Sequence, residues 1–230
     1  MKCLAALLFL ASLAAAAAPP AQINAEYAVT TSGMTVGHVS ESYTRTGDRY
    51  TIQSVTRSEG ILKMFVDDEF TAQSAGRVGT LGLQPLSYSE HRGKDSKRDL
   101  RSDFDWDKGV MHTVLHGESS DSALPRDTQD RISMMYQFMN MKKFGDTFVV
   151  PMADRRKVET YTYRLVEEVK LATPVGGFDT LHYERVVSDP RDTRADVWLA
   201  KDRFNFPVRV VYDDPKRFRL EQTLVALEAK

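Results

Sequence analysis

Cysteine is nearly absent from this chain. Of its 230 residues only Cys3 is a cysteine, and it lies in an N-terminal stretch that we expect to be removed. A chain without cysteine can form neither disulfides nor thiolate metal sites. The mature protein must therefore be held together by core packing, which about 210 residues can supply in one domain.

A strong charge of either sign and long apolar runs are also missing beyond the N-terminus. The chain has 31 Lys and Arg against 32 Asp and Glu, a formal net charge of −1. This balance gives no electrostatic basis for binding nucleic acid or for strong attraction to anionic lipid. No later segment is apolar enough to cross a bilayer. We therefore expect no nucleic-acid partner and no integral membrane segment.

The N-terminal stretch has the three parts of a secretory signal peptide. The positively charged Met1–Lys2 precedes an apolar core, Leu4–Leu13, and small residues follow at Ala14–Ala18. The apolar core is too short for a permanent membrane helix. The sequence therefore predicts export to the periplasm.

Cleavage of this signal peptide defines the expected mature protein. A cut after Ala17 is favoured, because a cut after Ala18 would leave Pro19 at the new N-terminus. A lipoprotein signal has its cysteine directly after the small residues, whereas Cys3 precedes the apolar core. We expect residues 1–17 to be the signal peptide and residues 18–230 to form a single β-rich domain that is soluble and not lipid-anchored.

The mature chain alternates apolar and polar residues along most of its length. The clearest run is Lys97–Trp106, in which one face carries Leu100, Ser102, Phe104 and Trp106 and the other carries Asp99, Arg101, Asp103 and Asp105. Such alternation is typical of a sheet with one face in a core and one in water. Turns that contain Gly or Asp separate the runs, as in successive hairpins.

One segment between Pro125 and Gly145 departs from this alternation. Its apolar residues recur at helical spacing, and Asp127 and Thr128 favour a helix start. The stripe consists of Ile132, Met135, Tyr136, Met139 and Lys143, widened by Phe138 and Met141. We predict one helix of about four turns. The expected fold is mainly β: a single, strongly curved antiparallel sheet, an open half-barrel built as a β-meander, with this helix packed in or over the concave face.

The C-terminal part resembles a known family. The strand Asp196–Leu199 is followed by Asp202, a second strand begins at Asn205–Val210, Asp213–Asp214 forms a turn, and Glu221–Leu227 closes the chain. These runs resemble the final hairpins of the DUF3108 family of uncharacterised exported bacterial proteins. The opening from Tyr27 to Tyr43, with Gly33 and Gly37, and the Met-rich segment also fit that family's layout. The resemblance implies a fold but little chemistry.

The same C-terminal pattern is similar to periplasmic lipoprotein carriers of the LolA/LolB type. Those carriers fold as an open, curved half-barrel with helices over its mouth. The resemblance implies a hydrophobic ligand, but only by analogy of fold. This chain departs from them because it offers one good helix rather than several.

Catalytic and metal-binding motifs are weak. His112 and His116 lie about 13 Å apart if their run is a strand at about 3.3 Å per residue, too far for one metal. The acidic run Asp67–Glu69 lacks the spaced ligands of a calcium loop, and the carboxylates of Asp103 and Asp105 are more typical of a solvated sheet face. The chain has no nucleophile elbow, phosphate-binding loop or dinucleotide fingerprint. We expect no catalytic residues, no cofactor and no metal.

The Met-rich segment is the remaining candidate site. Its flexible side chains either pack the core or line a cavity inside the curved sheet, where aromatic residues from the strands would face them. The candidate ligand-binding residues are Met134, Met135, Phe138, Met139, Phe104, Trp106 and Trp198.

Three functions remain open from the sequence. The first is non-catalytic binding of a hydrophobic or amphipathic ligand, such as lipid or lipoprotein acyl chains. The second is a structural or interaction protein of the cell envelope that pairs with an envelope partner through exposed strand edges. The third and weakest is a hydrolase, which requires carboxylates or histidines brought together in one cleft.

Overall fold

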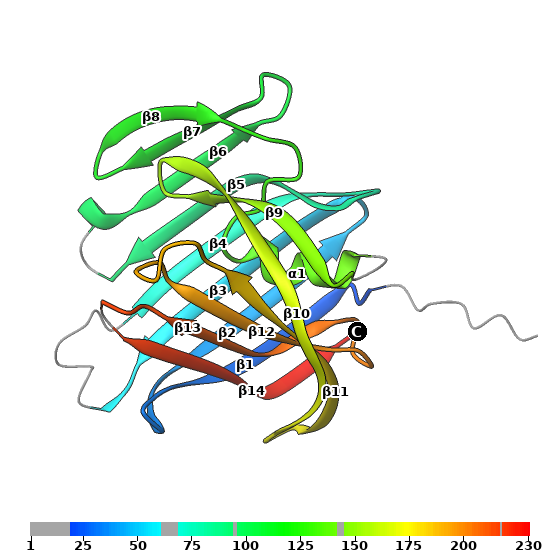
Figure 1. Ribbon diagram of the computed structural model, residues 1–230. Helices are drawn as coiled ribbons and strands as arrows, with labels where there is room; N and C mark the ends of the chain where they lie inside the picture. The colour runs from blue at the N-terminus through cyan, green and yellow to red at the C-terminus, as the bar shows by residue number, and fades with distance from the viewer. Residues whose placement is uncertain (1–18, 61–68, 94–95, 142–144, 217) are drawn as a thin grey trace, which may run out of the picture.

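The computed structural model describes residues 19–60, 69–93, 96–141, 145–216 and 218–230 (Figure 1). The expected signal peptide, residues 1–17, lies outside the described residues, as do Asp67 and Asp68 of the acidic run. Within the described part of the chain, no helix is both long and apolar enough to cross a membrane.

Within the described residues, fourteen antiparallel strands form one sheet. The first eight are β1 Gln22–Thr31, β2 Met34–Thr46, β3 Arg49–Ser58, β4 Glu69–Gly79, β5 Gly82–Arg92, β6 Leu100–Asp105, β7 Val110–Leu115 and β8 Glu118–Ala123. The last six are β9 Thr147–Asp154, β10 Lys157–Thr173, β11 Gly176–Val186, β12 Arg194–Ala200, β13 Phe206–Asp213 and β14 Arg219–Ala229. Short helical segments are η2 Ser96–Arg98, α1 Ser133–Gln137 and η3 Phe138–Asn140.

The two ends of the described chain meet in the middle of this sheet. Strand β1 pairs with β14, so the sheet order is β8 to β1 followed by β14 down to β9. Lys230 accepts hydrogen bonds from the backbone N–H groups of Ala21 and Gln22, at 2.7 and 3.0 Å. We call β1–β8 the first arm of the sheet and β9–β14 the second arm. The open, curved meander expected from the sequence is confirmed.

Alternation along the strands separates a buried inner face from an exposed outer face. In β1, Ile23, Ala25 and Tyr27 are buried while the residues between them are exposed. In β6, Leu100, Ser102 and Phe104 are buried, as the pattern of that run predicts. Each strand contributes every second side chain to the inner face, so the core lies on the concave side of the sheet.

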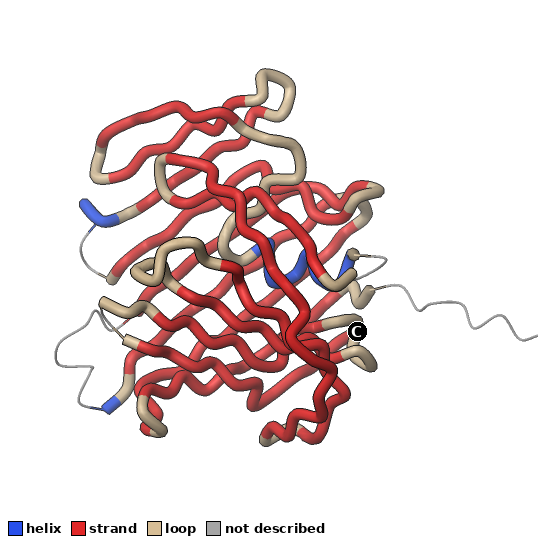
Figure 2. Tube along the Cα trace, viewed as in Figure 1, coloured by secondary structure: helices blue, strands red, loops and turns tan. Residues whose placement is uncertain are grey.

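The chain crosses between the two arms through the inside of the curved sheet. We call this crossing, residues 124–141, the plug segment. Its helix α1 contacts β5 of the first arm and β13 of the second, and Figure 2 shows this short helix among the strands. Its buried side chains are Leu124, Thr128, Gln129, Asp130, Ile132, Ser133, Met134, Tyr136, Phe138 and Met139. The plug segment therefore packs against the concave side of the sheet.

The predicted length of this helix is wrong. Helix α1 has five residues and continues as one 3-10 turn, instead of about four α-helical turns. The backbone of Asp127 has a φ of +63°, and Met141 is extended, so neither belongs to a helix. The spacing of apolar residues does not correspond to a long helix here, because strands surround the segment on several sides. Burial in the plug segment therefore does not follow one helical stripe.

Asp130 sets the start of the helix in place of the expected Asp127 or Thr128. Its Oδ1 accepts hydrogen bonds from the N–H groups of Ile132 and Ser133, at 3.1 and 2.8 Å. The first N–H groups of a helix have no partner within it, and a carboxylate just before the helix supplies one. Burial raises the pKa of Asp130 to about 6, although the hydrogen bonds from Ser133, Ser74 and Ile132 oppose this rise.

Two glutamines fix the plug segment to both arms. Gln129 exchanges backbone hydrogen bonds with Pro151 and Ala153 of β9, at 2.9 and 2.8 Å, and its Nε2 donates to the Leu83 carbonyl of β5. Gln137 accepts a 2.7 Å hydrogen bond from the Leu83 N–H and donates to the Leu81 carbonyl. The plug segment thus joins strands that are not neighbours in the sheet.

The edges of the sheet approach each other at one point. Strands β8 and β9 end the sheet and do not pair with each other. Arg156, in the turn between β9 and β10, donates to the Leu115 carbonyl at 3.0 Å and to the Glu118 carboxylate at 2.7 Å. The barrel-like curve is therefore held by side chains there and not by a closed ladder.

Candidate functional site

A cavity lies between the plug segment and the second arm. Its volume is about 270 Å³, and its apolar lining consists of Met134, Met135, Met152, Ala153 and Ala195. All of these except Met135 are buried, so this side of the cavity is continuous with the core. The cavity is bounded by two layers of the protein, the plug segment and the sheet.

Polar groups form the rest of the cavity wall. They comprise three arginines, three tyrosines, one aspartate and one threonine: Arg131, Arg155, Arg185, Tyr161, Tyr163, Tyr212, Asp154 and Thr193. The lining therefore carries three positive charges against one negative charge. A cavity with this balance favours an anion.

Not all N–H donors of Arg185, on β11, have a hydrogen-bond partner. Its guanidinium lies 3.5 Å from the centre of the Tyr161 ring, and its Nη1 donates to the Thr193 carbonyl at 3.2 Å. Its Nε is buried without a hydrogen-bond partner, and no carboxylate of the described chain forms an ion pair with it. A guanidinium has five N–H donors, so Arg185 can also bind an acceptor from outside the protein.

Arg131 of the plug segment shares its only ion-pair partner in the described chain. Its Nη1 lies 3.4 Å from Oε1 of Glu90, which is 6% exposed, while Arg131 itself is 55% exposed. Glu90 also accepts hydrogen bonds from Arg92 at 2.9 Å and from Tyr88 at 2.8 Å. Burial acts to raise the pKa of Glu90, but Arg131, Tyr88 and Arg92 outweigh it and lower that pKa. One carboxylate thus serves two arginines.

The three tyrosines of the cavity remain protonated. Burial raises the pKa of Tyr161, Tyr163 and Tyr212 above the ordinary value of a phenol. The nearby charge of Arg185 lowers the pKa of Tyr161 and Tyr163, and that of Arg131 lowers the pKa of Tyr212, without cancelling the effect of burial. Their hydroxyl groups are therefore hydrogen-bond donors at neutral pH.

The candidate binding residues from the sequence do not gather in one place. Met134 and Met135 line the cavity. Phe138 and Met139 are buried in the core, where Phe138 lies against the Phe148 ring with the ring centres 5.5 Å apart.

Two more candidates lie in the first arm, away from the cavity lining. Phe104 is buried on the inner face of β6 and stacks on Trp106. The indole of Trp106 donates a 2.6 Å hydrogen bond to the Pro85 carbonyl. Sequence reasoning missed the arginines and tyrosines of the second arm, because they alternate along strands like any solvated face.

Trp198 lies on the outer face of the sheet. In β12 its neighbours Val197 and Leu199 are buried on the inner face, so the alternation turns Trp198 outward. Its ring stacks on His182 with the ring centres 4.1 Å apart, and Arg209 lies 4.9 Å from the ring centre. Trp198 therefore does not face the plug segment, contrary to the sequence interpretation.

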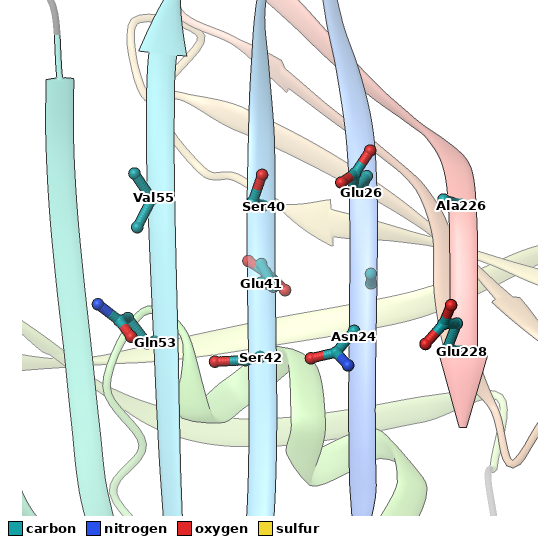
Figure 3. A pocket seen from close by; sticks show the side chains of 10 residues that line it. Asn24, Glu26, Ser40, Glu41, Ser42, Gln53, Val55, Ala226 and Glu228 are labelled. Atoms are coloured by element: carbon teal, nitrogen blue, oxygen red, sulfur yellow. The ribbon is translucent and has the colours of Figure 1, made fainter. Parts of the chain in front are cut away.

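A shallow groove on the outer face differs from this cavity. It runs over β14, β1, β2 and β3, and Figure 3 shows its exposed lining, which includes Glu26 and Glu228. Glu41 is drawn behind β2, on the opposite face from its neighbours Ser40 and Ser42. There Glu41 accepts a 3.1 Å hydrogen bond from the Tyr136 hydroxyl in the plug segment.

Histidines and carboxylates pair across neighbouring strands of the outer face. His112 of β7 lies opposite Asp121 of β8 and contacts it at 2.7 Å, and His182 contacts Asp196 at 2.8 Å. Side-chain pairs across neighbouring strands stabilise a sheet. No group of three or more metal-ligating side chains occurs in the described ranges.

The two candidate catalytic carboxylates also have partners on this face. Asp103 accepts hydrogen bonds from Arg101 at 3.0 and 3.1 Å, and Asp105 accepts one from Lys108 at 2.8 Å. These contacts give both carboxylates a structural role on a solvated strand face.

Comparison with solved structures identifies the architecture. A β-barrel-like protein of the DUF1849 domain of unknown function from Brucella abortus has a TM-score of 0.59 and 14% identity, over 93% of this chain and 100% of that chain. A candidate exported protein with a YmcC-like fold from Bacteroides fragilis has a TM-score of 0.38 and 11% identity, over 92% and 97% of the two chains. The first of these likenesses shows the fold alone. The expected likeness to LolA/LolB-type carriers is not confirmed.

Comparison with protein sequences gives the family. No protein of curated function is significantly similar to this chain. Residues 26–221 match the family described as "Protein of unknown function (DUF3108)". Since this match spans most of the 230 residues, the chain belongs to the DUF3108 family.

Proposed function

We propose that this chain is a non-catalytic protein of the cell envelope that binds a small amphipathic ligand in the cavity between the plug segment and the second arm. The observation that carries the proposal is the composition of the cavity wall. Methionines form one part, and arginines and tyrosines form another. Ligand sites typically combine a concave apolar lining with a few converging polar groups.

The size of the cavity limits the ligand. Sites for drug-sized ligands occupy about 300–1,000 Å³, and this cavity has about 270 Å³. The plug segment occupies the concave side that a lipoprotein's acyl chains would need. The cavity therefore favours a small amphiphile over a lipoprotein, and the lipoprotein part of the sequence prediction gains no support from its volume.

The place of action is part of the same proposal. Residues 1–17 would direct the chain to the periplasm and be cleaved after Ala17, which leaves residues 18–230 as one soluble domain without a lipid anchor. Mass spectrometry of the protein isolated from a periplasmic fraction tests this directly. A mature mass that begins at Ala18 is expected, and retention of Met1 or a lipid adduct would contradict it.

Native mass spectrometry together with displacement of an apolar fluorescent probe tests the binding function. The purified protein is expected to retain a small amphiphile, or to bind the probe at one saturable site. Met135→Trp, which fills the cavity, should abolish probe binding, whereas Met34→Trp, at a 65% exposed position outside it, should not. A protein that shows neither adduct nor probe binding would contradict the proposal.

The free edge of β8 supports a second candidate function. This six-residue strand pairs with β7 and forms the end of the sheet, so no neighbouring strand of the described chain forms a ladder with its outer edge. An envelope partner could add a strand there. Photo-cross-linking from Ser119 in cells would then give one stoichiometric adduct. The same probe at Thr51, an exposed residue of β3, which is paired with strands on both sides, would not. Equal labelling from both positions would exclude this function.

A further inference from the structure

We propose that the ligand of this cavity carries an anionic oxygen head group, a carboxylate or a phosphate monoester, held by Arg185 and Arg131 while its apolar part lies on the methionines. The inference rests on the proposed function and adds the chemical class of the ligand.

The first step of the argument is the charge left without a partner. Arg185 contacts a ring and one carbonyl, and no carboxylate of the described chain pairs with it. A half-buried guanidinium without an anionic partner has lost part of its hydration and has gained few polar contacts in exchange. An anionic oxygen in the cavity would restore that loss with charge-assisted hydrogen bonds.

The second step is the convergence of donors from different elements. Arg131 comes from the plug segment, Arg185 from β11, and the hydroxyls of Tyr161 and Tyr163 from β10. Guanidinium groups match the geometry of carboxylate and phosphate oxygens. Arg131 is paired with Glu90, and Asp154, the one acid of the lining, does not neutralise both Arg155 and Arg185. A cationic ligand would meet this excess of positive charge, which makes it the disfavoured class.

The third step is the position of the apolar surface. Met134 and Met152 are buried at the same cavity, and Met135 is half-buried beside them. Methionine side chains adapt to apolar groups of irregular shape. With about 270 Å³ available, a short alkyl chain fits the wall better than paired long chains.

Isothermal titration with four probes of equal alkyl length tests this inference on the unmodified protein. The probes are octanoate, octyl phosphate, octanol and octyltrimethylammonium, each kept below its micelle-forming concentration. One of the two anions is expected to bind about tenfold or more tighter than octanol. The tighter anion distinguishes a carboxylate from a phosphate ligand. Equal binding of all four, or preference for the cation, would overturn the head-group inference while leaving the proposed function in place.

Variants locate the head group. Arg185→Gln should weaken binding of the preferred anion about tenfold or more and leave octanol binding unchanged, and Arg185→Lys should recover part of the loss. Arg101→Gln removes the same charge from an exposed outer-face position and should change neither. If Arg101→Gln weakens binding as much as Arg185→Gln, or if neither variant weakens it, the inference fails. Absence of binding by all four probes and by the apolar probe would contradict both proposals together.

Discussion

Ser74 of β4 donates a 2.6 Å hydrogen bond to the carboxylate of Asp130, a residue of the plug segment with no exposed surface. The same Ser74 hydroxyl lies 3.1 Å from the hydroxyl of Tyr50 on β3. Through Asp130 the start of the helix is therefore fixed to the inner face of the first arm. This contact positions the plug segment and, with it, the wall of the cavity.

The buried Asp130 should make stability depend on pH. Burial raises its pKa from an ordinary value of 3.8 to about 6. Between these values the folded protein holds a proton that the unfolded chain has released, so the contribution of this group to the free energy of unfolding falls as pH rises from about 4 to about 6. The fall is on the order of 2–3 kcal/mol.

Urea unfolding of the native protein and of Asp130→Asn over pH 4 to 7 measures this effect. The amide keeps an acceptor for the helix start and does not titrate in this range. The native protein should lose stability relative to the variant as pH rises. A difference between the two proteins that stays constant over this range would contradict the assignment.

Gly82 should tolerate no side chain. Its φ is +107°, and a Cβ there would collide with the amide of Gln137. That amide bonds the Leu83 N–H and the Leu81 carbonyl, so its displacement would also break both bonds. Gly82→Ala should lower the free energy of unfolding by about 2–4 kcal/mol.

Gly33→Ala is the matched control, because Gly33 also has a positive φ, +79°, but open space around it. It should cost about 1–2 kcal/mol, from backbone strain alone. Equal losses for the two variants, measured by denaturant unfolding, would show that the contact with Gln137 contributes nothing.

Substitutions at Met134 and Met135 should differ in their effects on stability and on ligand binding. Met134 is 1% exposed and packed in the core of the second arm, so Met134→Ala should cost about 2–5 kcal/mol of unfolding free energy. Met135 is half-buried, and Met135→Ala should cost about 1 kcal/mol or less while weakening binding of the apolar probe. Thermal unfolding and probe titration measure both. The reverse order of stability losses would contradict the placement of these residues.

Trp198 should matter for stability and not for binding. Trp198→Ala removes the stack on His182 and the contact with Arg209, and should cost about 1–3 kcal/mol. Trp198→Phe should recover most of this loss, because it keeps an aromatic ring. Affinity for the cavity probe should be unchanged in both variants, and a loss of affinity would place Trp198 in the site after all.

The sequence predicts the sheet well where alternation is strong. The run from Leu100 to Asp105 has buried and exposed residues in the expected order. Strand β8 gave no such signal. Three of the six residues of Glu118–Ala123 are serines, and the segment is a strand because β7 pairs with it.

The candidate site was predicted in part, for a physical reason. Methionines in the plug segment suggested an apolar surface, and Met134 and Met135 do line a cavity. The polar part of its wall depends on how β10, β11 and β13 curve around the plug segment. Tyr161 and Arg185 are 24 positions apart in the chain, and only the register of β10 against β11 brings them together.

Methyl NMR of the methionine side chains during an octanoate titration tests the central claim most directly. Met134, Met135 and Met152 line the cavity, whereas Met111 is fully buried in β7 of the other arm. The account predicts saturable shifts of the three cavity methyl groups, with the Met111 methyl unmoved. Absence of a saturable shift at the cavity methyl groups, or equal shifts at Met111, would contradict it.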